Sequence, residues 1–152
     1  MVMGRSLIIA VDFDGTCVSH DFPAIGKEIG APPVLRAIAA SGHRLVLFTM
    51  RSDVDNPITT DPDIVAESGD YLSQAVEWFK AHDIPLFGIN KNPEQHTWTS
   101  SPKAYANMYI DDLALGVPLK MDSNISDGPF VDWAAVRRML ENAGIITYDK
   151  TT

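Results

Sequence analysis

The chain has 152 residues, and its 20 acidic and 12 Lys or Arg side chains give a formal charge of −8. This length predicts one domain over residues 1–152, and the excess of acid argues against a nucleic-acid partner. The single cysteine excludes an intramolecular disulfide and a cysteine-based zinc site. The longest apolar run, residues 7–11, is far below the ~20 residues that cross a bilayer. We therefore expect a soluble, cytoplasmic protein with no membrane partner and no signal peptide.

The first half of the chain predicts a strand, a helix and a second strand. Residues 7–11 form a continuous apolar run, which is typical of a strand buried on both faces. Pro32 and Pro33 suit the first turn of a helix, and Gly42 suits its C-terminal cap. A weaker apolar run at residues 44–49 predicts the second strand.

The second half repeats this alternation. Apolar residues at helical spacing predict a helix that ends near His82: Leu72, Ala75, Val76 and Phe79. Strands are predicted at residues 84–89 and 107–111, and a terminal one at 145–148. Between the last two, Asp132 can cap a helix with an inner face of Trp133, Val136, Met139 and Leu140.

Strands that alternate with helices predict an α/β fold, a Rossmann-like three-layer α/β/α sandwich with a mainly parallel sheet. The segments 52–68, 90–102 and 113–131 are rich in Pro, Asp, Asn, Ser and Thr, and we expect them to be loops. In such a fold the functional site lies at the carboxyl ends of the strands.

Two acids follow the first predicted strand, in the sequence Asp12-Phe13-Asp14-Gly15-Thr16. Like charges at the end of a buried strand repel each other unless something compensates them. A divalent metal bound by a carboxylate is one answer. A strand followed by an Asx-type turn is the alternative.

Further polar residues follow the other predicted strands. Thr49 ends the second strand, Asp111 and Asp112 end the fourth, and Lys103 lies eight positions before Asp111. If these strands are neighbours, four carboxylates converge with only a threonine and a lysine near them. Oxygen ligands of this kind select Mg²⁺ rather than zinc or copper.

The order of these residues resembles the motifs of the haloacid dehalogenase superfamily. The first motif is matched by Asp12-x-Asp14-Gly15-Thr16 and the second by Thr49. The third is matched by Lys103, and the fourth by the pair Asp111-Asp112. The resemblance covers about residues 7–116.

The resemblance implies a role for each matched residue. Asp12 would be the nucleophile that forms an aspartyl-phosphate, and Asp14 the general acid and then the general base. Mg²⁺ would be held by the Asp12 carboxylate, the Asp14 backbone carbonyl and Asp111. Thr49 and Lys103 would bind the transferring phosphoryl oxygens, and Lys103 would also offset the charge of Asp12.

Several assignments stay open at this point. Lys91 follows the third predicted strand and is an alternative to Lys103. Asp112 is either a second group of the metal site or a solvated turn acid. His20 is either a surface side chain or a substrate contact, and Arg51 either binds a phosphate or substrate carboxylate or forms a salt bridge.

The resemblance implies a member without a cap domain, because only 33 positions separate Thr16 from Thr49 and 54 separate Thr49 from Lys103. We expect a Mg²⁺-dependent phosphate monoester hydrolase that acts on a small phosphorylated substrate, a sugar phosphate or nucleoside monophosphate. One alternative is a phospho-accepting, receiver-like signalling switch, although Thr49 stands where its acceptor would be expected. Another alternative is an inactive phosphate-binding scaffold. No pattern in the sequence predicts an oligomeric state.

Overall fold

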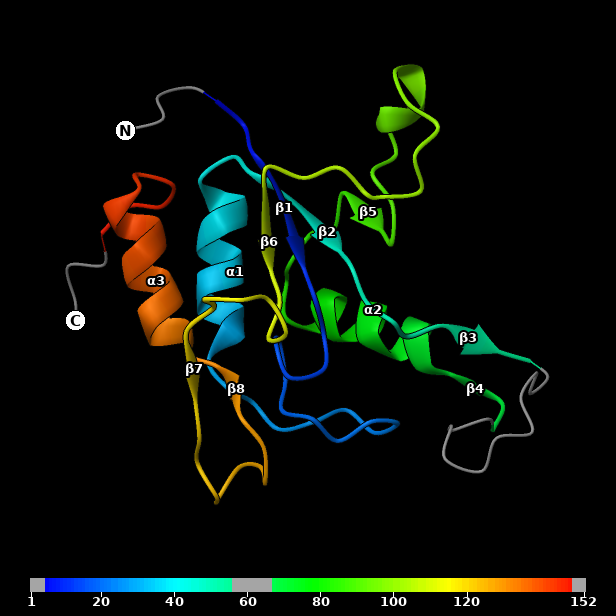
Figure 1. The fold of residues 1–152 in the computed structure, drawn as a ribbon, viewed down its shortest axis with the longest axis vertical. Coiled ribbons are helices and arrows are strands. Elements are labelled where there is room, and N and C mark those ends of the chain that lie inside the picture. Colours follow the sequence, from blue (N-terminus) through cyan, green and yellow to red (C-terminus); the bar gives the residue numbers. More distant parts are fainter. Residues whose placement is uncertain (1–4, 56–66, 149–152) are drawn as a thin grey trace.

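Four short strands form a parallel sheet at the centre of the molecule (Figure 1). They are β1 (Ile8–Val11), β2 (Arg44–Leu47), β5 (Gly88–Ile89) and β6 (Met108–Ile110), in the order β5-β2-β1-β6 across the sheet. The structure, a computed structural model, describes residues 5–55 and 67–148. Because β1 pairs with both β2 and β6, the segments that follow these three strands emerge at one edge of the sheet.

Three helices accompany the sheet: α1 (Ala31–Ala40), α2 (Tyr71–Ala81) and α3 (Trp133–Asn142). The predicted caps are confirmed, since α1 has proline in its first turn and Asp132 accepts a hydrogen bond from the Ala135 N–H at 3.2 Å. The predicted end of α2 near His82 is also confirmed. These elements make the chain an α/β protein, consistent with a Rossmann-like fold.

The main core lies on one face of the sheet. Ile9 and Val11 of β1 point into it together with Leu45 and Leu47 of β2. Buried residues of all three helices belong to the same cluster, including Val34, Leu35, Ile38, Ala75, Phe79, Trp133, Val136 and Leu140. Figure 1 shows α1 and α3 next to each other beside the sheet.

The opposite face is covered differently. Ile8, Ala10 and Val46 point to this face and pack with Ala106 and the partly buried Phe87. A right-handed connection from β5 back to β6 has to cross here, because β1, β2 and β5 progress in the other direction. The crossing segment, residues 90–107, contains one short helix, η1 (Gln95–Thr97). A sandwich with helices on both faces is therefore not confirmed among the described residues.

Two small antiparallel pairs complete the fold: β3 (Asp53–Val54) with β4 (Gly69–Asp70), and β7 (Leu119–Lys120) with β8 (Phe130–Val131). The hairpin of β7 and β8 projects from the same end of the molecule as the carboxyl ends of β1 and β6 (Figure 1). Its Val131 N–H donates to the Gly15 carbonyl at 3.1 Å, which fixes the hairpin to the loop after β1.

Some sequence predictions need correction. The terminal strand at 145–148 is wrong, because the chain turns back after α3 and the Ile145 N–H donates to the Leu140 carbonyl at 2.9 Å. The predicted strand 84–89 is reduced to β5, and Pro85 lacks the N–H that a longer strand would need. Met139 is 55% exposed and does not belong to the inner face of α3.

Two predictions bear on the remaining segments. Of the predicted loop 52–68, residues 56–66 lie outside the described residues. In the part of the chain that the structure describes, no helix is long and apolar enough to cross a membrane.

Candidate metal centre

The carboxyl ends of β1 and β6 bring three aspartates together. Asp12 directly follows β1, and its backbone N–H donates to the carbonyl of Ile110 at 3.0 Å, so the two strands are still paired where the acids begin. Asp111 and Asp112 directly follow β6. One carboxylate oxygen from each of the three lies within 4.8 Å of the other two. Three of the four predicted acids therefore converge.

Thr16 links two of these carboxylates. Its hydroxyl lies 3.0 Å from Asp12 Oδ2 and 3.1 Å from Asp112 Oδ1, and it accepts the backbone N–H of Asp112 at 3.0 Å. Thr16 is fully buried, and its carbonyl accepts the indole N–H of Trp133 at 2.7 Å. Sequence reasoning included Thr16 in the first motif but assigned it no contact, because its partner Asp112 is 96 positions away.

Within residues 5–55 and 67–148, no Lys or Arg side chain pairs with the three carboxylates. Among the described residues, the single ion-pair contact to this group is made by His20, whose Nε2 lies 2.8 Å from Asp112 Oδ2. Burial, together with the neighbouring Asp112 and Asp111, raises the pKa of Asp12 from its ordinary value of 3.8 to about 8. The site is therefore short of positive charge.

The donor set fits a magnesium ion. Three carboxylates offer only oxygen ligands, which is the chemistry that Mg²⁺ selects, and the set contains no thiolate or imidazole ligand that would favour zinc. A divalent cation would also supply the charge that the described residues do not. The predicted ligands Asp12, Asp111 and Asp112 are thus placed to hold it.

Asp14 has a different environment. Its carboxylate does not join the cluster but forms a two-pronged salt bridge with Arg51, with Nε to Oδ2 and Nη2 to Oδ1 both at 2.8 Å. The side chains of Arg51 and Asp14 are 1% and 17% exposed. Of the two alternatives for Arg51, the structure has the salt bridge. The predicted role of the Asp14 backbone carbonyl as a metal ligand stays a prediction.

Arg51 also holds the surrounding chain segments. It donates to the carbonyls of Pro23, Ala24 and Tyr71 at 2.8–3.3 Å, so all five N–H groups of the guanidinium have acceptors. The rings of Phe13 and Phe22 each lie 5.0 Å from its guanidinium carbon, measured to the ring centroid. Arg51 therefore connects the loop after β1 to the start of α2.

Thr49 lies at the same edge of the sheet, after β2. Its backbone N–H donates to Asn90 Oδ1 at 2.7 Å, and its hydroxyl accepts the backbone N–H of Arg51 at 3.1 Å. The hydroxyl hydrogen of Thr49 remains available for another acceptor. Asn90 was missed by sequence reasoning, although its position directly after the third predicted strand was a signal that could have identified it.

Neither candidate lysine contacts the carboxylates. Lys103 is exposed, and its Nζ lies 5.5 Å from the centroid of the Tyr109 ring. Lys91 lines a pocket of about 570 Å³ within the loop of residues 91–104. Within residues 5–55 and 67–148, neither lysine forms an ion pair with an acid. The choice between them stays open.

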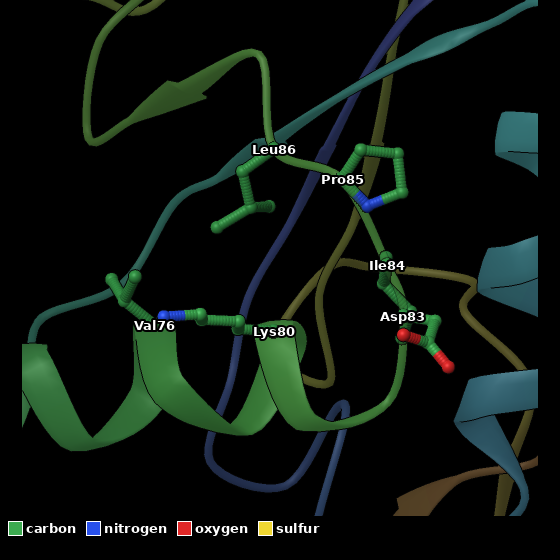
Figure 2. Close-up of a pocket in the computed structure, with 6 residues that line it drawn as sticks. All are labelled: Val76, Lys80, Asp83, Ile84, Pro85 and Leu86. Atoms are coloured by element: carbon green, nitrogen blue, oxygen red, sulfur yellow. The ribbon is translucent and has the colours of Figure 1, made fainter.

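A second pocket lies apart from these residues. It measures about 430 Å³ and is an open pocket between α2 and the segment that follows it (Figure 2). The Lys80 side chain lies along the helix toward Val76, Leu86 points toward the helix, and Asp83, Ile84 and Pro85 also line the pocket. None of the predicted site residues lines this pocket.

Comparison with known proteins supports the fold. No family model matches the chain, and no curated protein matches it significantly. Among solved structures, the chain is similar to a conserved protein from Bacteroides thetaiotaomicron, with 29% identity and a TM-score of 0.65. The similarity covers 96% of this chain and 100% of the other. The similarity thus extends over nearly the whole chain. It adds no activity, because that protein is described only as conserved.

Proposed function

We propose that the chain is a Mg²⁺-dependent phosphate monoester hydrolase of the haloacid dehalogenase superfamily. The observation that carries this proposal is the group of Asp12, Asp111 and Asp112, which meet at the carboxyl edge of a parallel sheet without a Lys or Arg partner in the described part of the chain. Functional sites in such sheets lie at this edge, and a cation is needed there before a phosphate can approach.

In the proposed reaction, an oxygen of the Asp12 carboxylate attacks the phosphorus of a phosphate monoester. The bond from phosphorus to the leaving oxygen breaks, that oxygen takes up a proton, and an aspartyl-phosphate forms. Water then attacks the phosphorus, which releases inorganic phosphate and restores the Asp12 carboxylate. When bound, Mg²⁺ would neutralise the charge of the phosphoryl oxygens and of the carboxylates that hold it.

The other predicted residues would bind the phosphoryl oxygens and protonate the leaving oxygen. Thr49 has a hydroxyl hydrogen free for a phosphoryl oxygen, and Lys103 would reach the same oxygens from the segment before β6. Asp14 would supply the proton for the leaving oxygen and then accept one from water. In the described arrangement its carboxylate is held by Arg51, so Asp14 has to leave that contact during the reaction.

The substrate class is proposed from the phosphatase resemblance of the sequence. Between Thr16 and Thr49 the chain forms a loop and α1, which together are too small for a cap domain. We propose a small phosphorylated substrate, a sugar phosphate or nucleoside monophosphate, hydrolysed in the cytoplasm. We also propose that residues 90–107 take the place of the second helical layer of a three-layer sandwich.

One observation favours a second candidate function. Because Arg51 occupies both oxygens of Asp14, an aspartyl-phosphate on Asp12 would lack a free base to activate water. Such an acyl-phosphate would persist, as it does in a phospho-accepting switch. The lifetime of the acyl-phosphate separates the two functions, since a hydrolytic intermediate is consumed rapidly and a switch retains its phosphate.

The test is phosphate release from a panel of sugar phosphates, nucleotides and an aryl phosphate, with Mg²⁺ and with a chelator. We expect release by the wild-type chain only with Mg²⁺, and its loss in Asp12→Asn and Asp14→Asn. Asp127→Asn is the control, because Asp127 is an exposed acid outside the group of Asp12, Asp111 and Asp112.

Two results would change the proposal. Release that persists in Asp12→Asn would exclude Asp12 as the nucleophile. A stable acyl-phosphate on Asp12 without turnover, detected after incubation with acetyl phosphate and Mg²⁺, would favour the switch.

A further inference from the structure

His20 has contacts that an incidental surface histidine would lack. Its side chain is 49% exposed, while the Asp112 side chain that it contacts is only 7% exposed. The ring nitrogen Nε2 lies 2.8 Å from Asp112 Oδ2. One side of the imidazole thus faces solvent, and the other reaches a largely buried carboxylate of the candidate metal centre.

Asp112 depends on His20 because its other donor is shared. The Thr16 hydroxyl has one hydrogen, and it lies at 3.0 Å from Asp12 Oδ2 and 3.1 Å from Asp112 Oδ1. That hydrogen cannot be donated fully to both carboxylates. His20 therefore provides a donor that Asp112 does not share with Asp12.

The backbone around Gly15 leaves the space for this contact. Gly15 has a φ of 80°, and a Cβ at this position would collide with His20 Nε2 and lie 2.6 Å from Asp112 Oδ2. Any other residue would push the ring and the carboxylate apart. A glycine at this position is thus needed both for the turn and for the close approach.

Hydrogen bonds at the base of its loop also fix the position of His20. The residue before it, Ser19, donates its N–H to the Lys27 carbonyl at 3.0 Å, and its hydroxyl accepts the Lys27 N–H at 2.8 Å. Ser19 is buried, so these bonds fix the base of the loop from which His20 projects.

We propose that His20 is a positioning residue for the metal centre: its hydrogen bond to Asp112 Oδ2 holds that carboxylate in the orientation in which it binds a divalent cation. Hydrogen bonds to metal-binding carboxylates orient them in this way, and losing one lowers metal affinity about 10- to 100-fold. The inference rests on the proposed function, because it requires that Asp112 belongs to a cation site.

The test measures metal binding without substrate. Binding of Mn²⁺, followed by electron paramagnetic resonance, and of Mg²⁺, followed by calorimetry, is compared among variants. We expect His20→Ala to weaken binding at least tenfold. His20→Gln should restore it to within about threefold of wild type, because the glutamine amide can donate from nearly the same position as Nε2. His96→Ala is the matched control, since His96 is an exposed histidine in the segment that crosses the other face of the sheet.

Each outcome decides the question. Wild-type affinity in His20→Ala, or equal weakness in His20→Gln and His20→Ala, would overturn the inference and leave the proposed function standing. A wild-type chain that binds neither metal would overturn the proposed function itself. If His20→Ala does not fold, the ¹⁵N resonances of the histidine rings in the wild-type chain test the inference instead. Those of the His20 ring should move on addition of Mg²⁺ while those of His96 do not, and an unmoved His20 ring refutes the inference.

Discussion

Replacing Asp12 with asparagine removes a carboxyl group whose ionisation destabilises the folded chain. Burial and the carboxylates of Asp112 and Asp111 raise the pKa of Asp12 from 3.8 to about 8. The folded chain therefore holds this proton more tightly than the unfolded chain does. The resulting contribution to stability is complete at low pH and is lost as the pH rises from about 4 to about 8. At about 1.4 kcal/mol per pH unit, the loss approaches roughly 5 kcal/mol in the metal-free protein.

The assay is urea unfolding in the presence of a chelator, followed by tryptophan fluorescence, since Trp133 is buried in the core. The quantity to compare is the difference in unfolding free energy between Asp12→Asn and wild type. Other titrating groups largely cancel in that difference. We expect Asp12→Asn to be the more stable chain by about 1.5 kcal/mol near pH 5, and by up to roughly 5 kcal/mol near pH 8.

Metal provides a second check on the same reasoning. In the proposed site Mg²⁺ would bind the ionised carboxylate, so saturating Mg²⁺ should stabilise the wild type at about pH 8, by about 2.7 kcal/mol at 100 times its Kd. Asp12→Asn should gain much less, because the amide is a poorer ligand. Asp127→Asn is the control and should gain as much stability from Mg²⁺ as the wild type does. A difference between Asp12→Asn and wild type that stays constant across the pH range would refute the assignment of this pH dependence to Asp12.

Three further changes test the contacts around the site. Arg51→Met leaves the Asp14 carboxylate without its partner, and we expect urea unfolding to show a loss of about 3–5 kcal/mol; a loss below about 1 kcal/mol would contradict the buried ion pair. Gly15→Ala forces a side chain onto a φ of 80° beside His20, so it should cost about 1–3 kcal/mol and weaken Mn²⁺ binding; unchanged binding would speak against the close approach. Trp133→Phe removes the 2.7 Å bond to the Thr16 carbonyl and should cost about 1–3 kcal/mol in urea unfolding followed by circular dichroism; an unchanged stability would contradict a contribution from this bond.

The regular elements of the fold were predictable where they bury a continuous apolar face. β1 is an unbroken apolar run with every residue buried, and α2 carries its buried Ala75 and Phe79 at helical spacing. The pairs β3–β4 and β7–β8 were not predicted, because two residues per strand are too few to show a periodic pattern. Their pairing is set by the loops that join them and by contacts such as that of Val131 with Gly15.

The layers on the two faces show a related limit. Strand and helix alternation predicts cover on both faces, but it does not say which connection lacks a helix. Here the connection from β5 to β6 is the one without a long helix, and residues 90–107 cross the face formed by Ala10 and Val46. The sequence predicts a loop over residues 90–102, and in this range the structure has only the short helix η1.

The candidate site was predictable to the extent that it follows from strand order. Asp12 and the pair Asp111-Asp112 each end a buried strand, and neighbouring parallel strands bring such residues to one edge. The contacts of Arg51 with Asp14 and of His20 with Asp112 were not predictable, because they join positions 37 and 92 residues apart. Those contacts depend on the paths of loops, for which the sequence has no periodic signal.

Asp14 and Asp12 differ in the way that the described residues compensate their charge. Asp14 and Asp12 are two positions apart, yet Asp14 has both oxygens bound to a buried guanidinium, whereas Asp12 has a threonine hydroxyl and other acids nearby. A Lys or Arg side chain paired with Asp12 would stabilise the metal-free protein. It would also occupy the place where, in the proposed function, a metal and a phosphate bind. The folded chain instead raises the pKa of Asp12, and a bound cation would lower that pKa again. This difference between Asp12 and Asp14 supports the proposed cation site at Asp12.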